Sequence, residues 1–297
     1  KWLSVLFFEV FNTPRDRRNI AQRSYLPEKI RKVLQDAPFL NGGLFDKNEL
    51  DRELDQKKDI TITDNHFRRV FNFLESYNFT IAEDSPIDQE VAVDPEMLGK
   101  VYESLVNVSE EADERGEAGI FYTPRTEIDL MCRLALVDNL ANNIGEEYKD
   151  YFYEVVFALE QDDKDRADKN LDNAGLWPKV AEHLQRITVV DPACGSGSFL
   201  VGMLHILDDL QERAGKYLGK TESRYDRMRR IIAQNLYGVD VMEWACRVAE
   251  LRLWLALIID LELSPEELRN RTEPLLPHFT FKIRCGDSLV QEVGGVN

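Results

Sequence analysis

The chain has 297 residues, 43% of them hydrophobic, which is enough for a sizeable core in one large domain or two ordinary ones. Its formal net charge of −17 argues against a protein that binds nucleic acid unaided, because phosphate contacts need clustered lysine and arginine side chains. If the protein binds nucleic acid, the part that does so should therefore lie outside this chain, unless the basic residues gather on one face.

Cysteine spacing and hydropathy argue against further classes of protein. The four cysteines lie far apart and form no C-x-x-C pair, which argues against a zinc site or a disulfide framework and indicates a reducing cytosol. The longest apolar run, residues 253–259, is too short to cross a bilayer. We therefore expect a cytoplasmic protein without a membrane contact. Because residue 1 is not Met and the chain begins inside the apolar stretch 2–8, we also expect a segment of a larger protein.

Residues 1–118 are predicted to be mostly helical. The turn chemistry of residues 38–45 interrupts the helical pattern. Asp94-Pro95 is typical of a helix start, with Asp as the N-cap and Pro as the first helical residue. Residues 109–119 contain few apolar side chains and are interpreted as a linker to a second domain.

Helical and extended patterns alternate after residue 119. Thr123 is a candidate N-cap and Pro124 the first residue of a helix, and the charged stretch 161–173 is predicted to be an exposed loop or a frayed helix end. Strands are predicted at 187–190, 236–240 and 278–284, and further helices at 198–214 and 223–235. This alternation predicts an α/β fold with a parallel sheet.

Two helices have predicted core faces. For the helix after Pro124 that face comprises Leu130, Leu134, Val137 and Leu140. For the apolar helix after the strand 236–240 it comprises Trp244, Val248, Leu251, Leu255 and Ile258. His183 and His205 are expected on helix faces, and no residue is predicted to bind a metal.

The most informative segment runs from Asp191 to Leu200. It joins a β-rich run to an apolar helical pattern through a glycine turn, which is the architecture of a nucleotide-sized ligand site at the carboxyl end of a parallel strand. Side chains at Gly195 or Gly197 would hold the backbone away from a ligand. Leu200 stands where a dinucleotide fingerprint needs its third glycine, which disfavours a nicotinamide-dependent oxidoreductase.

In its Asp-Pro-Ala-Cys-Gly-Ser-Gly form, this segment resembles the first motif of the S-adenosylmethionine (SAM) methyltransferases, in particular the adenine-specific (N6) DNA methyltransferases of restriction–modification systems. The segment Phe121-Tyr122-Thr123-Pro124 is similar to the amino-terminal SAM motif of the same family. Residues 40–45 and 94–103 resemble the helical connector of bacterial type IIG restriction–modification enzymes and of phage-defence methyltransferases. The resemblance covers roughly residues 38 to 290.

This resemblance implies a helical connector domain over residues 1–118, followed over residues 119–297 by the first half of a Rossmann-like SAM-dependent methyltransferase domain. It implies SAM as the cofactor and the adenine amino group of double-stranded DNA as the methyl acceptor. DNA would be contacted mostly through regions outside this chain, and a nuclease and a target-recognition domain are possible fusion partners.

Acidic side chains follow three predicted strands. The segment from Asp191 to Gly197 would cradle the methionine part of SAM, Asp240 would accept hydrogen bonds from the ribose hydroxyls, and Asp287 would accept one from the adenine amino group. Each acid also has a simpler interpretation: Asp191 and Asp287 could close turns, and Asp240 could cap a helix. The residues predicted to bind the cofactor are Phe121, Tyr122, Thr123, Pro124, Asp191, Ala193, Cys194, Gly195, Gly197, Ser198, Phe199, Asp240, Val241, Asp287 and Ser288.

No catalytic residue is predicted within the chain. The family's Asn-Pro-Pro-Tyr motif, which holds the flipped base, does not occur in it. Cys194 is interpreted as a packed turn residue rather than a nucleophile, and no Pro-Cys motif supports cytosine-C5 methylation. We expect this segment to bind SAM and not to methylate DNA by itself. An RNA or protein-glutamine methyltransferase and a non-catalytic SAM-binding connector remain as alternatives.

Overall fold

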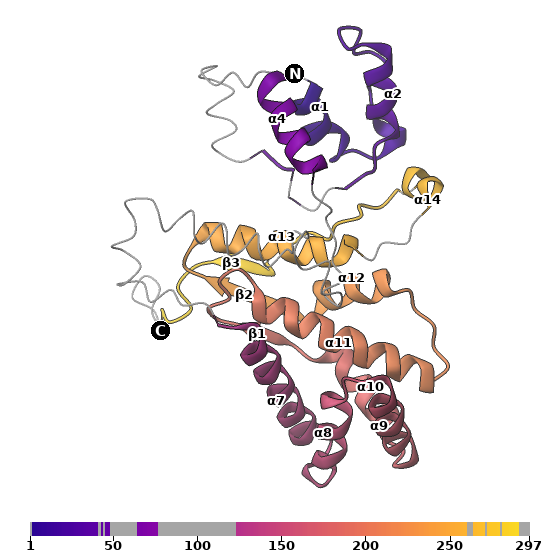
Figure 1. Cartoon of the computed structure of the whole chain (residues 1–297), viewed down its shortest axis with the longest axis vertical. Coiled ribbons are helices and arrows are strands. Elements are labelled where there is room, and N and C mark those ends of the chain that lie inside the picture. The colour runs from indigo at the N-terminus through magenta and orange to yellow at the C-terminus, as the bar shows by residue number, and fades with distance from the viewer. Residues whose placement is uncertain are drawn as a thin grey trace. The chain divides into compact units, whose positions relative to one another are not determined.

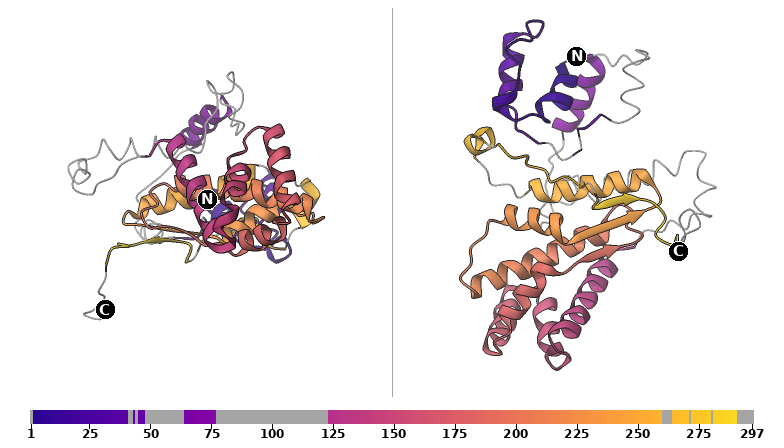
Figure 2. Two further views of the ribbon diagram at one scale, coloured as in Figure 1. Left: turned by 90° about the horizontal axis from the view of Figure 1, so that it is seen from below. Right: turned by 180° about the vertical axis from the view of Figure 1, so that it is seen from behind.

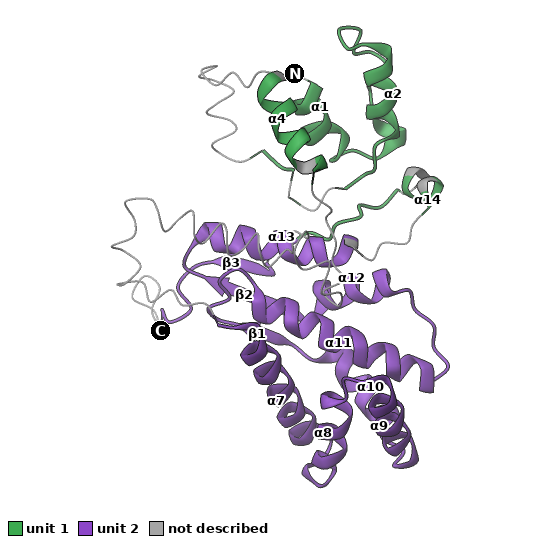
Figure 3. Ribbon diagram, viewed as in Figure 1, with its two compact units in different colours: residues 1–113, 262–278 green, residues 114–261, 279–297 purple. Residues whose placement is uncertain are grey.

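The computed structural model describes residues 2–40, 43, 45–47, 64–76, 123–259, 264–270, 272–279 and 281–290. The chain divides into two compact units (Figure 3): unit 1 comprises residues 1–113 and 262–278, and unit 2 comprises residues 114–261 and 279–297. The helix start predicted at Asp94, the linker predicted at 109–119 and the Phe121-Tyr122 pair lie outside the described residues. The predicted domain limit at residues 118 and 119 stays a prediction.

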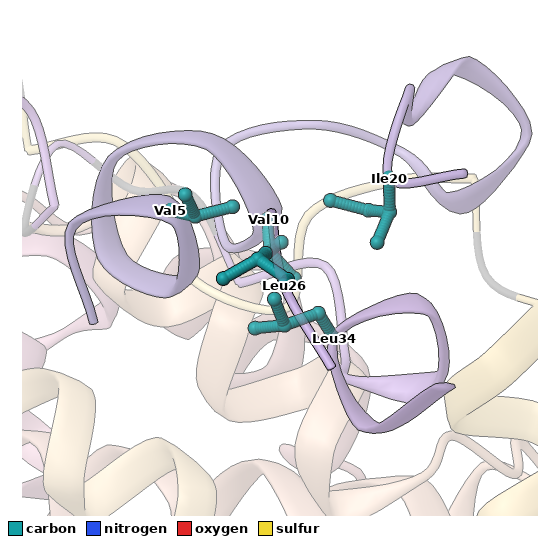
Figure 4. Close-up of a cluster of buried hydrophobic side chains, with 5 residues drawn as sticks. All are labelled: Val5, Val10, Ile20, Leu26 and Leu34. Atoms are coloured by element: carbon teal, nitrogen blue, oxygen red, sulfur yellow. The ribbon is translucent and has the colours of Figure 1, made fainter. Parts of the chain in front are cut away.

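The described part of unit 1 is helical, as predicted for this half of the chain. Its elements are α1 (Trp2–Val5), η1 (Leu6–Val10), η2 (Arg15–Arg17), α2 (Glu28–Asp36), α4 (Asp64–Glu75) and α14 (Pro265–Asn270). Its small core consists of Val5, Val10, Ile20, Leu26 and Leu34, which converge from α1, η1, α2 and the loop between η2 and α2 (Figure 4). Arg18 closes this loop, because its Nη1 donates to the carbonyl oxygens of Gln35 and Ala37 at the end of α2.

Unit 2 combines helices with a small parallel sheet (Figure 1), which agrees with the predicted α/β class. Its elements are α7 (Arg125–Ile144), η4 (Glu146–Tyr148), α8 (Lys149–Phe157), α9 (Gln161–Asn173), α10 (Trp177–Arg186), β1 (Val189–Asp191), α11 (Ser198–Tyr217), α12 (Arg224–Gln234), β2 (Leu236–Asp240), α13 (Glu243–Ile259) and β3 (Ile283–Cys285). The strand order is β1-β2-β3, with both pairs parallel.

The two faces of this sheet differ in what covers them. Val189, Leu236 and Ile283 share one face by register, and α11 and α13 pack against it. Figure 2 shows the strands along one side of unit 2, with its helices stacked on the other. On the opposite face, Val190 is 59% exposed, and the ammonium group of Lys282 lies 3.7 Å from the ring centroid of Tyr237. Because successive side chains of a strand point to opposite faces, the sheet has one face packed against helices and one open face.

The charged stretch 161–173 forms the helix α9, so the prediction of a loop or frayed end is wrong. The reason is a buried ion pair. Asp168 is 5% exposed and accepts a hydrogen bond from Arg213 Nε of α11 at 2.9 Å, while Leu171 is fully buried beside it. A segment with many charged residues is expected to be exposed to solvent. Only the tertiary structure shows that one of its aspartates is buried and paired with an arginine.

The third strand is shorter than predicted. It begins at Ile283 rather than 278, because Phe281 and Lys282 lie in a turn in which Lys282 N–H donates to the carbonyl oxygen of Phe279 at 2.7 Å. Phe281 in this turn has a φ of +71° and is exposed. The Phe279 side chain is buried against Trp254 of α13, with ring centroids 4.9 Å apart. This apolar residue therefore packs against a helix and is not part of the strand.

The predicted core faces of two helices are only partly right. On α7, Val137 and Leu140 are buried, but Leu130 and Leu134 are exposed. On α13, Val248 is buried, but the residues with the lowest exposure are not the predicted stripe; they are Ala245, Ala249, Leu253, Trp254 and Leu257. Both helices carry apolar residues on more than one side, so a helical period does not identify the side that packs.

Candidate functional site

The predicted glycine turn connects the end of β1 to the first turn of α11. Cys194 N–H donates to the carbonyl oxygen of Val239 in β2 at 2.9 Å, and Gly197 N–H donates to the carbonyl oxygen of Cys194 at 2.7 Å. The Cys194 side chain is buried, as predicted, and burial raises the pKa of its thiol. The turn is therefore held against the sheet by backbone hydrogen bonds, with its cysteine as a packed residue.

The two glycines of this turn have different surroundings. Gly195 has a φ of +50°, and a Cβ built on it would have no heavy atom within 4 Å, so it faces open space. Gly197 has a φ of +81°, and a Cβ there would lie 2.9 Å from the Cβ of Ala249 in α13. The prediction that both glycines leave room for a ligand fits Gly195. At Gly197 the space is taken by α13, and a glycine is needed for packing.

Asp191, the last residue of β1, has one satisfied and one unsatisfied carboxylate oxygen. Its Oδ1 accepts a hydrogen bond from Ala193 N–H at 3.1 Å, which is the turn-closing contact of the simpler interpretation. Its Oδ2 is buried and has no hydrogen-bond partner within the described part of the chain. Burial, and to a lesser extent the nearby carboxylate of Asp240, raise the pKa of Asp191. A buried oxygen without a partner is costly unless a ligand supplies the donor.

Asp240, the last residue of β2, joins the turn to α13. Its Oδ2 accepts a hydrogen bond from Gly195 N–H at 2.8 Å, and its Oδ1 accepts one from Met242 N–H at 2.9 Å, directly before α13. The helix-start interpretation is thus realised in part, because Asp240 does hold the chain that enters α13. Each carboxylate oxygen has a second lone pair, so both can still accept a hydrogen bond from a ligand.

Asp287 lies two residues beyond β3. Gly286 N–H donates to the carbonyl oxygen of Asp240 at 2.9 Å, which extends the β2–β3 pairing to this point. The Asp287 side chain is exposed, and its Oδ1 accepts a hydrogen bond from Leu289 N–H at 2.8 Å, which is a turn contact. Since the three strands are parallel and adjacent, Asp191, Asp240 and Asp287 all follow strand ends at one edge of the sheet.

The other predicted site residues flank this edge. Ala193, Val241 and Ser288 are exposed, while Ser198 and Phe199 are half-buried in the first turn of α11. Phe121 and Tyr122 lie outside the described residues, so their contacts stay a prediction.

Thr123 and Pro124 lead into α7, which packs against the beginning of α11. Cys132 Sγ of α7 lies 3.7 Å from the carbonyl oxygen of Phe199, and a Cβ on Gly202 would lie 3.2 Å from Ile128. A small residue at 202 therefore allows the close approach of the two helices.

Three residues that shape this edge were not predicted from the sequence. Arg252 of α13 contacts the glycine turn through its guanidinium group, and Ala249 packs under Gly197. Gly238 in β2 leaves room for Cys194 and Leu200, since a Cβ there would lie 2.9 Å from the nearest atom of each. Arg252 is the one charged residue in the apolar stretch 251–259, and that isolation was the available sequence signal.

The histidines are placed as predicted. His183 lies on α10 with its Nε2 2.6 Å from Asn139 Oδ1, and His205 is exposed on α11. Among the described residues, no group of three or more histidine, cysteine or acidic side chains is arranged to hold a metal ion. No helix among them combines the length and apolar character needed to span a membrane.

Chemically, this edge offers three acids, a backbone turn that is open at Gly195, and the N-terminal end of α11. The acids favour a ligand that carries a positive charge or hydrogen-bond donors. The free N–H groups at a helix N-terminus favour an anionic group such as a carboxylate. A ligand with both kinds of group would match the edge better than a simple anion.

Comparison with known proteins agrees with this description. The family model of the MmeI DNA-methyltransferase domain matches residues 165–293, which include the glycine turn and all three acids. A putative type II restriction enzyme and methyltransferase of Methanocaldococcus jannaschii is 36% identical over 97% of this chain. DNA methyltransferase A of Bacillus subtilis is 24% identical over 88% of the chain.

The chain spans about a quarter of the length of these relatives, 23% of the first and 25% of the second. No solved structure matches it significantly. The matches to the domain family and to both relatives confirm the resemblance to restriction–modification methyltransferases that the glycine motif indicated.

Proposed function

We propose that this chain is part of a site-specific DNA methyltransferase that transfers a methyl group from SAM to the N6 amino group of adenine, in a restriction–modification or phage-defence system. Within it, residues 1–118 would form a helical connector and residues 119–297 the first half of a Rossmann-like SAM domain. The observation that carries the proposal is the set of Asp191, Asp240 and Asp287 at consecutive strand ends around a turn that is open at Gly195.

The groups of SAM match the groups on this edge. The unpaired Asp191 Oδ2 would accept a hydrogen bond from the ammonium group of the methionine part, which relieves the cost of its burial. The N-terminal end of α11 would face the carboxylate of that part. Asp240 would accept from the ribose hydroxyls, and the exposed Asp287 from the adenine amino group. The orphaned oxygen and the open face of Gly195 are the observations that support this fit.

The chain's own contribution to the reaction is binding and orientation. SAM, when bound, supplies an electrophilic methyl group on its sulfonium. Orientation of two reactants can lower a barrier by about 7–11 kcal/mol, and the carboxylates of this edge would fix the cofactor for that purpose. The target adenine would be flipped out of duplex DNA and held by an Asn-Pro-Pro-Tyr type motif, which does not occur among these 297 residues. The proposed substrate of the whole enzyme is double-stranded DNA, contacted mostly through regions outside this chain, and a nuclease and a target-recognition domain are its possible fusion partners.

Calorimetric titration of the chain with SAM tests the proposal. We expect binding by the wild-type chain and a loss of affinity of about tenfold or more in Asp191→Asn, because a hydrogen bond between charged groups is lost. Asp162→Asn is the matched control, since Asp162 is exposed on α9 away from this edge. Equal affinity of the wild type and Asp191→Asn would contradict the proposed position of the methionine part. Methyl transfer to duplex DNA by this chain alone would contradict the assignment of the base-binding motif to other parts of the enzyme.

The RNA and protein-glutamine alternatives lack a specific observation in their favour. The matched domain family and the Bacillus subtilis relative are both described as DNA methyltransferases. The non-catalytic alternative, a SAM-binding connector, makes the same binding prediction as our proposal. The two differ in the full-length protein, in which the connector would bind SAM and leave DNA unmethylated.

A further inference from the structure

Arg252 of α13 contacts the glycine turn through its buried side chain. The residue is 6% exposed on α13, and its Nη1 lies within hydrogen-bond distance of three acceptors. It donates to the carbonyl oxygen of Ser196 at 3.0 Å, to Ser196 Oγ at 3.1 Å and to Ser198 Oγ at 2.8 Å. These two serines flank Gly197, so one guanidinium group holds both sides of the residue at which the turn becomes a helix.

Ala249 supports the same point by packing. It precedes Arg252 by three residues, which places both on one face of α13. A Cβ on Gly197 would lie 2.9 Å from the Ala249 Cβ and 3.1 Å from its Cα, so the turn rests directly on the helix. The Ala249 contact prevents the turn from moving toward α13, and the Arg252 hydrogen bonds prevent it from moving away.

The beginning of α13 is tied to the same turn. Asp240 accepts from Gly195 N–H through one carboxylate oxygen and from Met242 N–H through the other. The turn is thus held at Gly195 by the residue that ends β2, and at Ser196 and Ser198 by the middle of α13. The turn is therefore held by contacts from outside its own motif.

We propose that Arg252 is a positioning residue for the cofactor, acting through the turn 195–198. By fixing Ser196 and Ser198, it would aim the first N–H groups of α11 and the open side of Gly195 at the methionine part of SAM. Its positive charge adds to the favourable potential for a carboxylate at that helix N-terminus. This role rests on the proposed function and adds a residue from outside the motif to the binding machinery.

Backbone hydrogen exchange of the ligand-free chain tests whether Arg252 holds the turn 195–198 in place. In Arg252→Lys the charge remains, but the fixed geometry of the guanidinium group is lost. We expect the Gly195 and Gly197 amides to exchange about tenfold faster or more in this variant, because they lie in the segment that Arg252 holds. Arg213→Lys is the matched control: Arg213 is equally buried on α11 and pairs with Asp168 instead of the turn. Unchanged exchange at both glycines in Arg252→Lys would overturn the inference.

Titrations with SAM and with adenosine test the functional part. Adenosine contains the ribose and adenine but lacks the methionine part. A positioning role therefore predicts that Arg252→Lys loses about tenfold or more in SAM affinity and less than about twofold in adenosine affinity. Arg213→Lys is expected to lower the denaturation midpoint and to leave both affinities unchanged.

The outcomes separate the two proposals. An equal loss for SAM and adenosine in Arg252→Lys, or normal SAM affinity in that variant, would contradict the positioning role alone. A wild-type chain that binds neither compound would contradict the proposed cofactor site and the positioning role with it.

Discussion

Replacing each turn glycine by alanine should separate packing from ligand contact. The cost of a left-handed conformation is about 1–2 kcal/mol for a residue with a Cβ, and it applies to both Gly195→Ala and Gly197→Ala. At Gly195 the new methyl group meets open space, so nothing is added to this cost. At Gly197 it would lie 2.9 Å from the Ala249 Cβ, and overpacking adds about 1–3 kcal/mol. We therefore expect destabilisation of about 1–2 kcal/mol for the first variant and about 2–5 kcal/mol for the second.

Urea unfolding followed by circular dichroism measures these free energies, and Gly175→Ala provides the control. Gly175 has a φ of +67° and open space around its Cβ position, and it lies between α9 and α10, away from the turn. Its variant should match Gly195→Ala in stability and leave SAM affinity unchanged, whereas Gly195→Ala should lower that affinity. Ala249→Gly should rescue part of the Gly197→Ala loss, because it removes the atom nearest to the new methyl group.

Two results would refute this reasoning. Equal destabilisation by Gly195→Ala and Gly197→Ala would show that contact with α13 does not decide the cost. A purely additive double variant of Gly197→Ala with Ala249→Gly would show that these two positions do not press on each other.

Three further predictions concern other groups in unit 2. Burial raises the pKa of Asp191 above its ordinary value of 3.8, so on acidification the ligand-free fold takes up this proton before the unfolded chain does. The wild type should therefore gain stability relative to Asp191→Asn as the pH is lowered from neutral toward 3.8, measured by urea unfolding at each pH. Asp168→Ala leaves the Arg213 guanidinium buried without its main partner and should lower the free energy of unfolding by about 3–5 kcal/mol. Glu182→Ala, in the exposed pair with Arg186, should lower it by less than about 1 kcal/mol, and equal losses in the two variants would contradict this prediction. Cys285 is the exposed thiol and the other three cysteines are buried, so one thiol should react quickly with Ellman's reagent and Cys285→Ser should abolish that fast phase.

Local patterns predicted the parts of the structure that depend on sequence neighbours. The strand–glycine turn–helix order around Asp191 and the acid at the end of β2 follow from such patterns. The helix predicted at 223–235 is α12, but Ser223 is its N-cap rather than its first residue, because Ser223 Oγ accepts a hydrogen bond from Asp226 N–H at 3.1 Å. The parallel sheet follows from the alternation of strands and helices.

The rest depends on partners that are distant along the chain. The helix α9 was missed because Asp168 pairs with Arg213, 45 residues later, and a charge pattern alone does not reveal a buried pair. The true start of β3 depends on Phe279 packing against Trp254. Arg252 acts on serines more than fifty residues before it. Motif reading finds residues that would face a ligand, and tertiary contacts identify those that hold them in place.

The charge balance of the strand-end edge gives the proposed cofactor a physical basis. SAM carries a sulfonium, an ammonium and a carboxylate, so its net charge is positive, whereas the demethylated product has lost the sulfonium charge. An edge with Asp191, Asp240 and Asp287, in a chain of net charge −17, attracts the positive form by Coulomb interaction. Arg252 acts in the opposite sense, since its cation lies beneath the turn at which the carboxylate would bind. Acids on the open side and an arginine on the packed side would thus match the two ends of a zwitterionic group. If the proposed cofactor is correct, the same acids would hold the product less strongly than the substrate, which would favour release of the product.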